Sequence, residues 1–209
     1  MTGRRPGLFV AIDGPGGVGK STTAAALARL LTAEYSPVHA TAEPSRTPLG
    51  NLIRQGTTEY RGMTLARMIA RDRRHHVARE IQPALTQGQL VLCDRFIASS
   101  LVLQRIDGIP LDTVWDLNRP VLRPDLTVLL GADPEVTAKR LANRGAHSRF
   151  ELMEDSTRIE ARLYEEAASF LRARGFLVME LDCTELTPKD VAARIADEVN
   201  DLRMGETHG

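Results

Sequence analysis

The sequence feature that most constrains the fold is a glycine-rich segment at residues 14–21, which reads GPGGVGKS. It fits the pattern G-x-x-x-x-G-K-[ST] and stands between an apolar run ending at Asp13 and a helical pattern that begins at Lys20. Glycines let successive backbone N–H groups point inward at phosphate oxygens, and the helix that follows adds positive potential. The segment therefore predicts a phosphate-binding loop (P-loop) in an α/β fold.

Short apolar runs alternate with longer amphipathic ones, which is the pattern of a mostly parallel sheet flanked by helices. Five strands are predicted, at Leu8–Asp13, Val38–Glu43, Leu90–Asp94, Leu126–Gly131 and Phe176–Asp182. Helices are predicted at Lys20–Tyr35, Met63–Gln87 with a kink or break at Pro83, Pro134–Asn143, Ser156–Arg174 and Pro188–Arg203. The pattern indicates an α/β fold in which a five-stranded, mostly parallel sheet carries the P-loop, as in P-loop kinases.

Length and composition indicate one globular domain over residues 1–209, with 43% hydrophobic and 26% charged residues. The 27 basic and 27 acidic residues cancel, so no net charge favours nucleic acid or a membrane surface as partner. The two cysteines, Cys93 and Cys183, lie outside any CxxC spacing and are expected to be buried free thiols. These features favour a cytoplasmic protein without a membrane segment.

The loop and the helix start predict an ATP site. Lys20 is expected to bridge the β- and γ-phosphates, and Ser21 is expected to hold Mg²⁺. An Asn-Lys-x-Asp element, with which GTPases read guanine, is absent from the sequence, which favours ATP. The predicted ATP-binding residues are Gly14, Pro15, Gly16, Gly17, Val18, Gly19, Lys20, Ser21 and Thr22.

A second acidic strand end supports this site. Leu90–Asp94 is an apolar run that ends in a carboxylate, the arrangement that holds the Mg²⁺ shell in P-loop enzymes. Strand ends of an open parallel sheet converge on the ligand crevice, so Asp13 and Asp94 should lie close to the loop. Arg95 follows at once and could bind the acceptor phosphate and the transferred phosphoryl group together. One such arginine is worth about 10³–10⁵ in rate.

The segment Arg144–Asp155 is polar, rich in arginine and without clear periodicity. It is predicted to be a mobile lid over the phosphates. Arg140, Arg144 and Arg149 are further candidates for neutralising charge during transfer, with a solvated surface role as the alternative.

Several motifs together resemble thymidylate kinases, in order from about Leu8 to about Thr184. The most family-specific are Thr47-Pro48-Leu49-Gly50 and Asp94-Arg95-Phe96. The others are Asp13 before the P-loop, Glu43-Pro44, Arg54, Asp72-Arg73, and Ser99-Ser100 through Gln104.

The resemblance implies a homodimeric kinase that phosphorylates dTMP with Mg-ATP. It implies that Lys20 and Arg95 handle the transferred group, with Asp94 as a further catalytic residue. The P-loop carries no basic residue before Lys20, so the lid must supply one; Arg149 matches best and Arg144 second. The implied metal ligands are Ser21, Asp13 and Asp94. The implied acceptor-binding residues are Asp13, Glu43, Arg54, Ile69, Arg73, Arg95, Ser99, Ser100, Leu103 and Gln104.

The chain departs from the family pattern on the acceptor side. Family members usually place an aromatic ring where this chain has Ile69, and often a tyrosine where it has Leu103. Arginine commonly precedes Glu-Pro, where Ala42 stands here, and an acid commonly stands at Ser148. Base stacking on an aromatic ring is worth about 1–3 kcal/mol. The hypothesis is therefore weaker dTMP binding, or a preference for another pyrimidine nucleotide.

Two other functions remain open from sequence alone. A deoxynucleoside kinase would need a general base for its neutral hydroxyl acceptor, and Glu43 could serve. The arginines Arg54, Arg73 and Arg95 favour a monophosphate acceptor instead. A non-enzymatic ATP-binding switch is the third possibility.

Overall fold

The computed structural model describes residues 7–32, 37–145 and 148–207. Within them, five parallel strands form one sheet in the order β2-β3-β1-β4-β5. The strands are β1 (Phe9–Asp13), β2 (Val38–Ala42), β3 (Leu90–Asp94), β4 (Leu126–Gly131) and β5 (Val178–Asp182). The predicted sheet is confirmed, with observed ends within two residues of the predicted ones.

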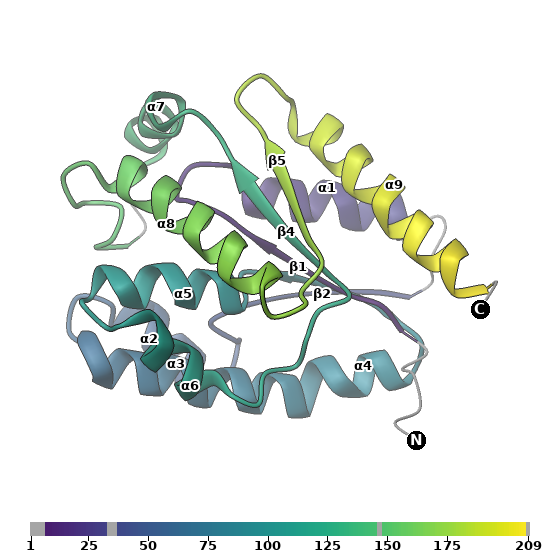
Figure 1. Cartoon of the computed structure of the whole chain (residues 1–209), viewed down its shortest axis with the longest axis horizontal. Coiled ribbons are helices and arrows are strands. Elements are labelled where there is room, and N and C mark those ends of the chain that lie inside the picture. Colours follow the sequence, from purple (N-terminus) through teal and green to yellow (C-terminus); the bar gives the residue numbers. More distant parts are fainter. Residues whose placement is uncertain (1–6, 33–36, 146–147, 208–209) are drawn as a thin grey trace.

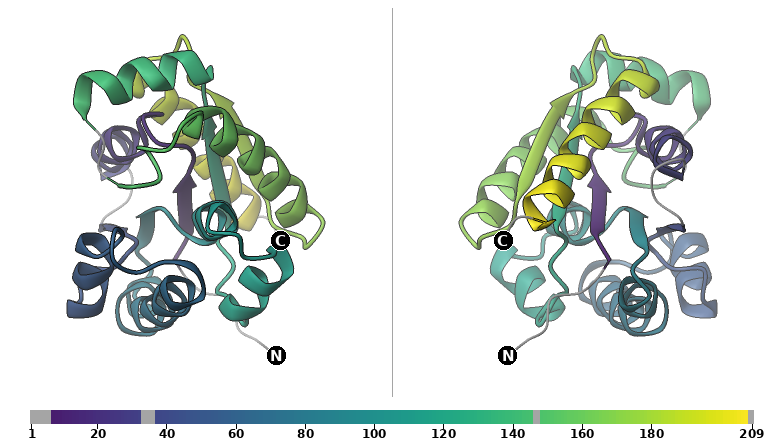
Figure 2. Two further views of the ribbon diagram at one scale, coloured as in Figure 1. Left: turned by 90° about the vertical axis from the view of Figure 1, so that its left-hand side faces the viewer. Right: turned by 90° about the vertical axis from the view of Figure 1, so that its right-hand side faces the viewer.

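Helices cover both faces of the sheet (Figures 1 and 2). On one face, α1 (Lys20–Thr32) and α9 (Pro188–Thr207) pack together over a core that contains Leu27, Leu31 and Ile195. On the other face, α5 (Ile97–Ile106) and α8 (Ser156–Arg172) pack over a core that contains Phe9 and Phe96. Because both faces are covered, the inner strands are almost wholly apolar.

Two predicted helices keep nearly their predicted bounds. The helix α7 covers Pro134–Arg144, and α8 covers Ser156–Arg172. The predicted continuation of α1 to Tyr35 lies outside the described residues. Among the described helices, none is both long and apolar enough to span a bilayer.

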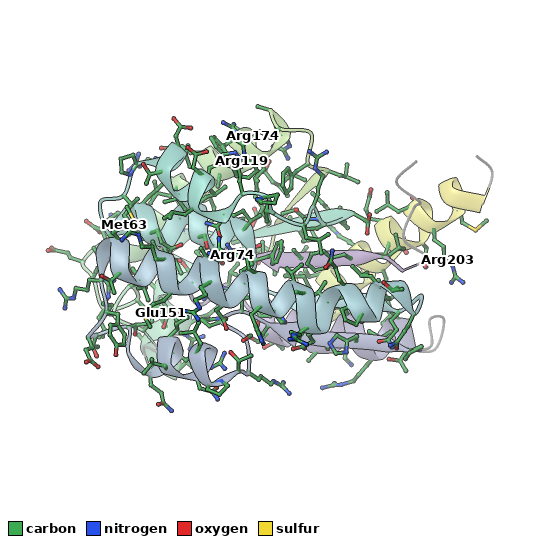
Figure 3. The ribbon with its side chains drawn as sticks, turned by 90° about the horizontal axis from the view of Figure 1, so that it is seen from below. Met63, Arg74, Arg119, Glu151, Arg174 and Arg203 are labelled. Atoms are coloured by element: carbon green, nitrogen blue, oxygen red, sulfur yellow. The ribbon has the colours of Figure 1, made fainter. Side chains whose placement is uncertain are left out.

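The long predicted helix at Met63–Gln87 does not break at Pro83; it continues with a π-helical segment before the proline. It consists of α3 (Gly62–His76), a π-helical segment at Val77–Ile81, and α4 (Gln82–Thr86). Figure 3 shows this run crossing the molecule, with Met63 towards one end and Arg74 further along. Proline lacks an N–H and cannot pair with the carbonyl four residues back. The π turn before it, where the Gln82 N–H pairs with the Val77 carbonyl, absorbs that mismatch.

Three helices go beyond the sequence prediction: α2 (Pro48–Gln55), α5 and α6 (Leu111–Asn118). The helix α2 is short, and Thr47 caps it through a bond from the Gly50 N–H at 3.1 Å. The helix α5 is buried over most of its length, so its sequence shows no polar face to give a helical period.

The chain direction places the functional elements at one edge of the sheet. All strands run parallel, so their carboxyl ends share an edge, and in Figure 1 the arrow of β4 points towards α7 and the start of α8. The chain leaves β1 towards β2 on one side and leaves β3 towards β4 on the other. Ligands of open α/β sheets bind in the crevice at such a reversal. Here the crevice lies between Asp13 and Asp94, the last residues of β1 and β3.

Candidate active site

The loop after β1 has the backbone of a phosphate cradle. Gly14, Gly17 and Gly19 have φ values of 147°, 77° and 102°, which residues with a side chain rarely adopt. Lys20 is buried, and its Nζ donates to the carbonyl of Pro15 at 2.7 Å across the loop. Burial lowers the pKa of Lys20 to about 7, and the positive charge of Arg95 also lowers it. Phosphate oxygens bound in the loop would place negative charge beside Lys20 and favour its protonated form.

The first helical turn and the end of β3 meet beside the loop. The Ser21 hydroxyl donates to Asp94 Oδ2 at 2.5 Å. Asp94 Oδ1 and Asp13 Oδ2 are both buried, and neither has a hydrogen-bond partner among the described residues. Oxygen atoms of this kind are what Mg²⁺ prefers, and Mg²⁺ usually takes only one or two carboxylates beside phosphates and waters. The residues present therefore fit a magnesium site at Ser21 and Asp94.

Asp13 orients the start of α5. Its Oδ1 accepts from the backbone N–H groups of Phe96 at 3.0 Å and Ser99 at 2.9 Å. Arg95 stands directly before Phe96, in the turn between β3 and α5, with a φ of 71°, a strained conformation for a residue with a side chain. Such backbone strain costs about 1–3 kcal/mol and is concentrated at functional sites. The strain directs the Arg95 side chain towards the crevice, where its Nη1 lies 3.3 Å from Ser99 Oγ.

Two cavities adjoin the P-loop. One has a volume of about 300 Å³ and is lined by Gly17, Thr22, Arg140, Cys183 and Leu186, among others. The second has a volume of about 400 Å³ and extends from Lys20 and Ser21 past Arg95 to Gln104. Gly17, Gly19, Thr22 and Arg144 line both. The P-loop thus separates a donor-side cavity from an acceptor-side cavity, and these names are used below for the two.

The acceptor-side cavity brings together many of the residues predicted from sequence. Those that line it are Gly17, Gly19, Lys20, Ser21, Thr22, Glu43, Arg54, Ile69, Arg95, Leu103 and Gln104. Pro44 of the Glu43-Pro44 motif lines it too, and residues that sequence reasoning did not assign to the site also contribute, among them Ile53, Thr57, Leu65, Phe150 and Glu151. Most of these are apolar residues whose sequence pattern is that of ordinary core.

Arg73, Ser99 and Ser100 lie behind this cavity wall rather than in it. Arg73 donates to Glu43 Oε2 at 2.7 Å, Asn118 Oδ1 at 2.5 Å and Ser100 Oγ at 2.9 Å. Its guanidinium is buried, and its donors are used within the protein. Arg73 therefore holds Glu43 at the cavity.

The two lid arginines lie in different places. Arg144 lines both cavities, and its Nη2 donates to Glu151 at 3.0 and 2.9 Å. Arg149 is outside both linings; it donates to Asp107 at 2.6 and 2.5 Å and to the Thr57 carbonyl at 2.5 Å. The geometry thus favours Arg144, the second choice from sequence, as the lid arginine near the phosphates.

Glu160 of α8 is a buried acid at the P-loop that sequence reasoning missed. Its Oε2 accepts from the Gly16 N–H at 2.9 Å, and burial raises the pKa of its carboxyl. No local pattern marks it, because an acid inside an amphipathic helix is usually exposed.

The comparisons with known proteins agree with this geometry. The family model described as thymidylate kinase matches residues 12–179. A thymidylate kinase of Xanthomonas campestris pv. campestris is 34% identical over 97% of this chain and 89% of its own length. A probable thymidylate kinase of Caldivirga maquilingensis is 35% identical over 83% of this chain and 85% of its own. The chain belongs to the thymidylate kinase family.

Proposed function

We propose that this protein transfers the γ-phosphoryl group of ATP to dTMP, giving ADP and dTDP. The observation that carries the proposal is that Arg144 and the P-loop glycines Gly17 and Gly19 line the donor-side and acceptor-side cavities alike. A donor and an acceptor bound in the two cavities would meet at these groups.

The site supplies what phosphoryl transfer needs, which is alignment and charge neutralisation. Lys20, Arg95 and Arg144 place three cations around the acceptor-side cavity. The P-loop N–H groups bind the donor phosphates. Ser21 and Asp94 would hold Mg²⁺, which neutralises charge on the donor phosphates when it is bound. Arg149 contributes through the position of the lid.

A monophosphate acceptor fits this site better than a nucleoside. A monophosphate is already anionic, so it needs cations rather than a base to remove a proton. Glu43, the candidate base, already accepts from Arg73 at 2.7 Å and lies 3.3 Å from His76 Nδ1. Both carboxylate oxygens of Glu43 thus face groups of the protein, which leaves Glu43 poorly placed to take a proton from a hydroxyl acceptor.

The test is a coupled assay of ADP release with ATP and a panel of acceptors: dTMP, dUMP, dCMP, UMP, CMP and thymidine. We expect ADP only when a nucleotide acceptor is present, with the highest kcat/KM for dTMP. Release of ADP without any acceptor would instead support a switch ATPase, and a preference for thymidine would support a nucleoside kinase. A higher kcat/KM for another pyrimidine nucleotide would trace to Ile69 and Leu103.

We also propose that the protein works as a homodimer in the cytoplasm, as the family resemblance implies. The chain mass is 23.0 kDa, so light scattering should give about twice that value for a dimer. A concentration-independent monomer mass would contradict this.

A further inference from the structure

Three consecutive lid residues, Arg149, Phe150 and Glu151, make contacts beside the site, and the Arg149 guanidinium carbon lies 4.1 Å from the centroid of the Phe150 ring, so a base would stack on the other face of that ring. Phe150 is only 3% exposed and packs with Ile53 and Leu65 in a small apolar cluster, separate from the two main cores. Among the described lid residues it is the only one in that cluster. A lid residue buried this deeply has a specific docking place.

That docking place is the wall of the acceptor-side cavity. Phe150, Ile53, Leu65, Ile69 and Leu103 all line the cavity. They form an apolar surface that a flat ring could cover, and Phe150 is its one aromatic member. Base–aromatic stacking is favourable for any base because every base has a π face.

A polar group faces the same cavity. Gln104 is buried on α5, and its Oε1 has no hydrogen-bond partner within the described part of the chain. An unpaired buried acceptor is costly, so Gln104 Oε1 is suited to accept a hydrogen bond from a ligand that enters the cavity. An apolar wall beside the polar side chain of Gln104 suits a nucleobase, which has an apolar face and a polar edge.

The neighbours of Phe150 connect this wall to the phosphate site. Arg149 fixes the lid on one side, through Asp107 at the end of α5 and the Thr57 carbonyl. Glu151 holds Arg144 on the other side through two bonds of about 3 Å. Phe150 and Arg144 are therefore linked through Glu151, which follows Phe150 in the chain and accepts from Arg144.

We propose that Phe150 is a specificity residue for the acceptor base, and that by carrying Glu151 it positions Arg144 when a base fills the cavity. The inference rests on the proposed function and deepens it. The ring that the chain lacks at Ile69 is thus supplied from the lid, so the acceptor wall is complete only with the lid docked.

The test compares Phe150→Ala, Phe150→Leu and Phe150→Tyr with two acceptors, dTMP and the base-free 2-deoxyribose 5-phosphate. Loss of the ring should lower kcat/KM for dTMP by about 5- to 150-fold, the range that corresponds to one stacked base. Activity with the base-free acceptor should change by less than about twofold, and Phe150→Tyr should restore dTMP activity. Leu152→Ala is the matched control, because Leu152 lies in the same loop and is 73% exposed.

Loss of kcat as well as a higher KM for dTMP would support the link to Arg144. Equal losses with both acceptors, or no loss with dTMP, would overturn the proposal. If Phe150→Ala fails to fold, Phe150→Leu keeps the apolar volume and decides alone.

Should the wild-type protein phosphorylate none of the panel, the proposed function fails by itself. Equilibrium binding of dTMP and of 2-deoxyribose 5-phosphate then decides the role of Phe150. Weaker dTMP binding in Phe150→Leu with unchanged binding of the base-free compound supports it, and unchanged dTMP binding overturns it.

Discussion

Arg144 and Arg149 belong to the same lid, yet their guanidinium groups have different surroundings. The side chain of Arg144 is 41% exposed beside the P-loop, and that of Arg149 is 13% exposed against Asp107. An arginine that binds a phosphate needs N–H groups that can leave their partners in the protein. Each guanidinium donates Nη2 to both oxygens of one carboxylate and Nε to a carbonyl, so the two differ in exposure and in place, and Arg144 alone of the two lines the cavities.

Replacing each arginine separates these roles. Arg144→Ala should lower kcat by about 10³-fold or more, because it removes charge from the transferred group. Arg149→Ala should lower kcat much less and should instead speed tryptic cleavage within the lid. Steady-state kinetics and limited proteolysis measure the two effects. A larger fall in kcat for Arg149→Ala than for Arg144→Ala would reverse the assignment.

At the residue scale, the sequence predicts the position of a site residue where a motif fixes the local backbone. The P-loop and the acid at Asp94 each follow from a strand end and a helix start, so spacing alone predicts their place. The choice between Arg144 and Arg149 depends instead on Asp107 and Thr57, which are distant in sequence. Glu160 is invisible for the same reason, since only the fold brings it to Gly16.

At the scale of elements, the π segment at Val77–Ile81 changes the angular spacing of side chains along the helix. His76 and Glu80, four residues apart, both face β2, where His39 Nε2 lies 3.0 Å from Glu80 Oε1. His76 Nε2 lies 2.8 Å from Thr41 Oγ1 on the same strand. These four residues, His39, Thr41, His76 and Glu80, form a polar ladder that joins the helix to the edge strand β2.

The carboxylate of Glu80 should make stability depend on pH. Burial alone would raise its pKa, but hydrogen bonds from Thr41 and His39 and the charge of His76 bring the pKa below its usual value. A lowered folded-state pKa means a stabilisation that is present above the unfolded glutamate pKa of about 4.3 and is lost as the pH falls further.

Urea unfolding of wild type and Glu80→Gln at pH 7 and pH 4 tests this expectation. The difference in unfolding free energy should be larger at pH 7 and should shrink at pH 4. Glu59→Gln, an exposed acid outside this ladder, is the control. An equal difference at both pH values would show that the charge of Glu80 does not matter.

On the scale of the whole molecule, one buried ion pair ties several elements together. Arg73 on α3 bonds Glu43 after β2, Asn118 on α6 and Ser100 on α5. The two charged side chains are 4% and 5% exposed. A buried charge without its partner is strongly destabilising.

Arg73→Met should therefore lower the unfolding free energy by about 3–5 kcal/mol. The double variant Arg73→Met/Glu43→Gln should recover part of that loss, because it leaves no unpaired charge. Chemical denaturation of the three proteins measures both effects. If the double variant is as unstable as the sum of the single ones, the bonds to Asn118 and Ser100 carry the effect instead.

The strands and the outer helices could be predicted from the sequence, whereas the short or buried helices and the order of the strands could not. Alternating strands and helices predicted all five strands and the outer helices, because amphipathic periods are local. The helices α2 and α5 were not predicted, because α2 is short and held by the Thr47 cap and α5 is buried on nearly all sides. The sheet order also depends on long-range packing that a single sequence does not display.

The shared wall of the two cavities has a stereochemical consequence. Gly17, Gly19 and Arg144 border the donor-side and acceptor-side cavities at once, so a donor and an acceptor bound there would meet directly, and we expect the acceptor oxygen to attack from the side opposite the leaving ADP. A single displacement of this kind needs no phosphorylated side chain and inverts the phosphorus centre. With a chiral γ-phosphate, the product should carry the inverted configuration, and initial-rate plots for the two substrates should intersect rather than run parallel.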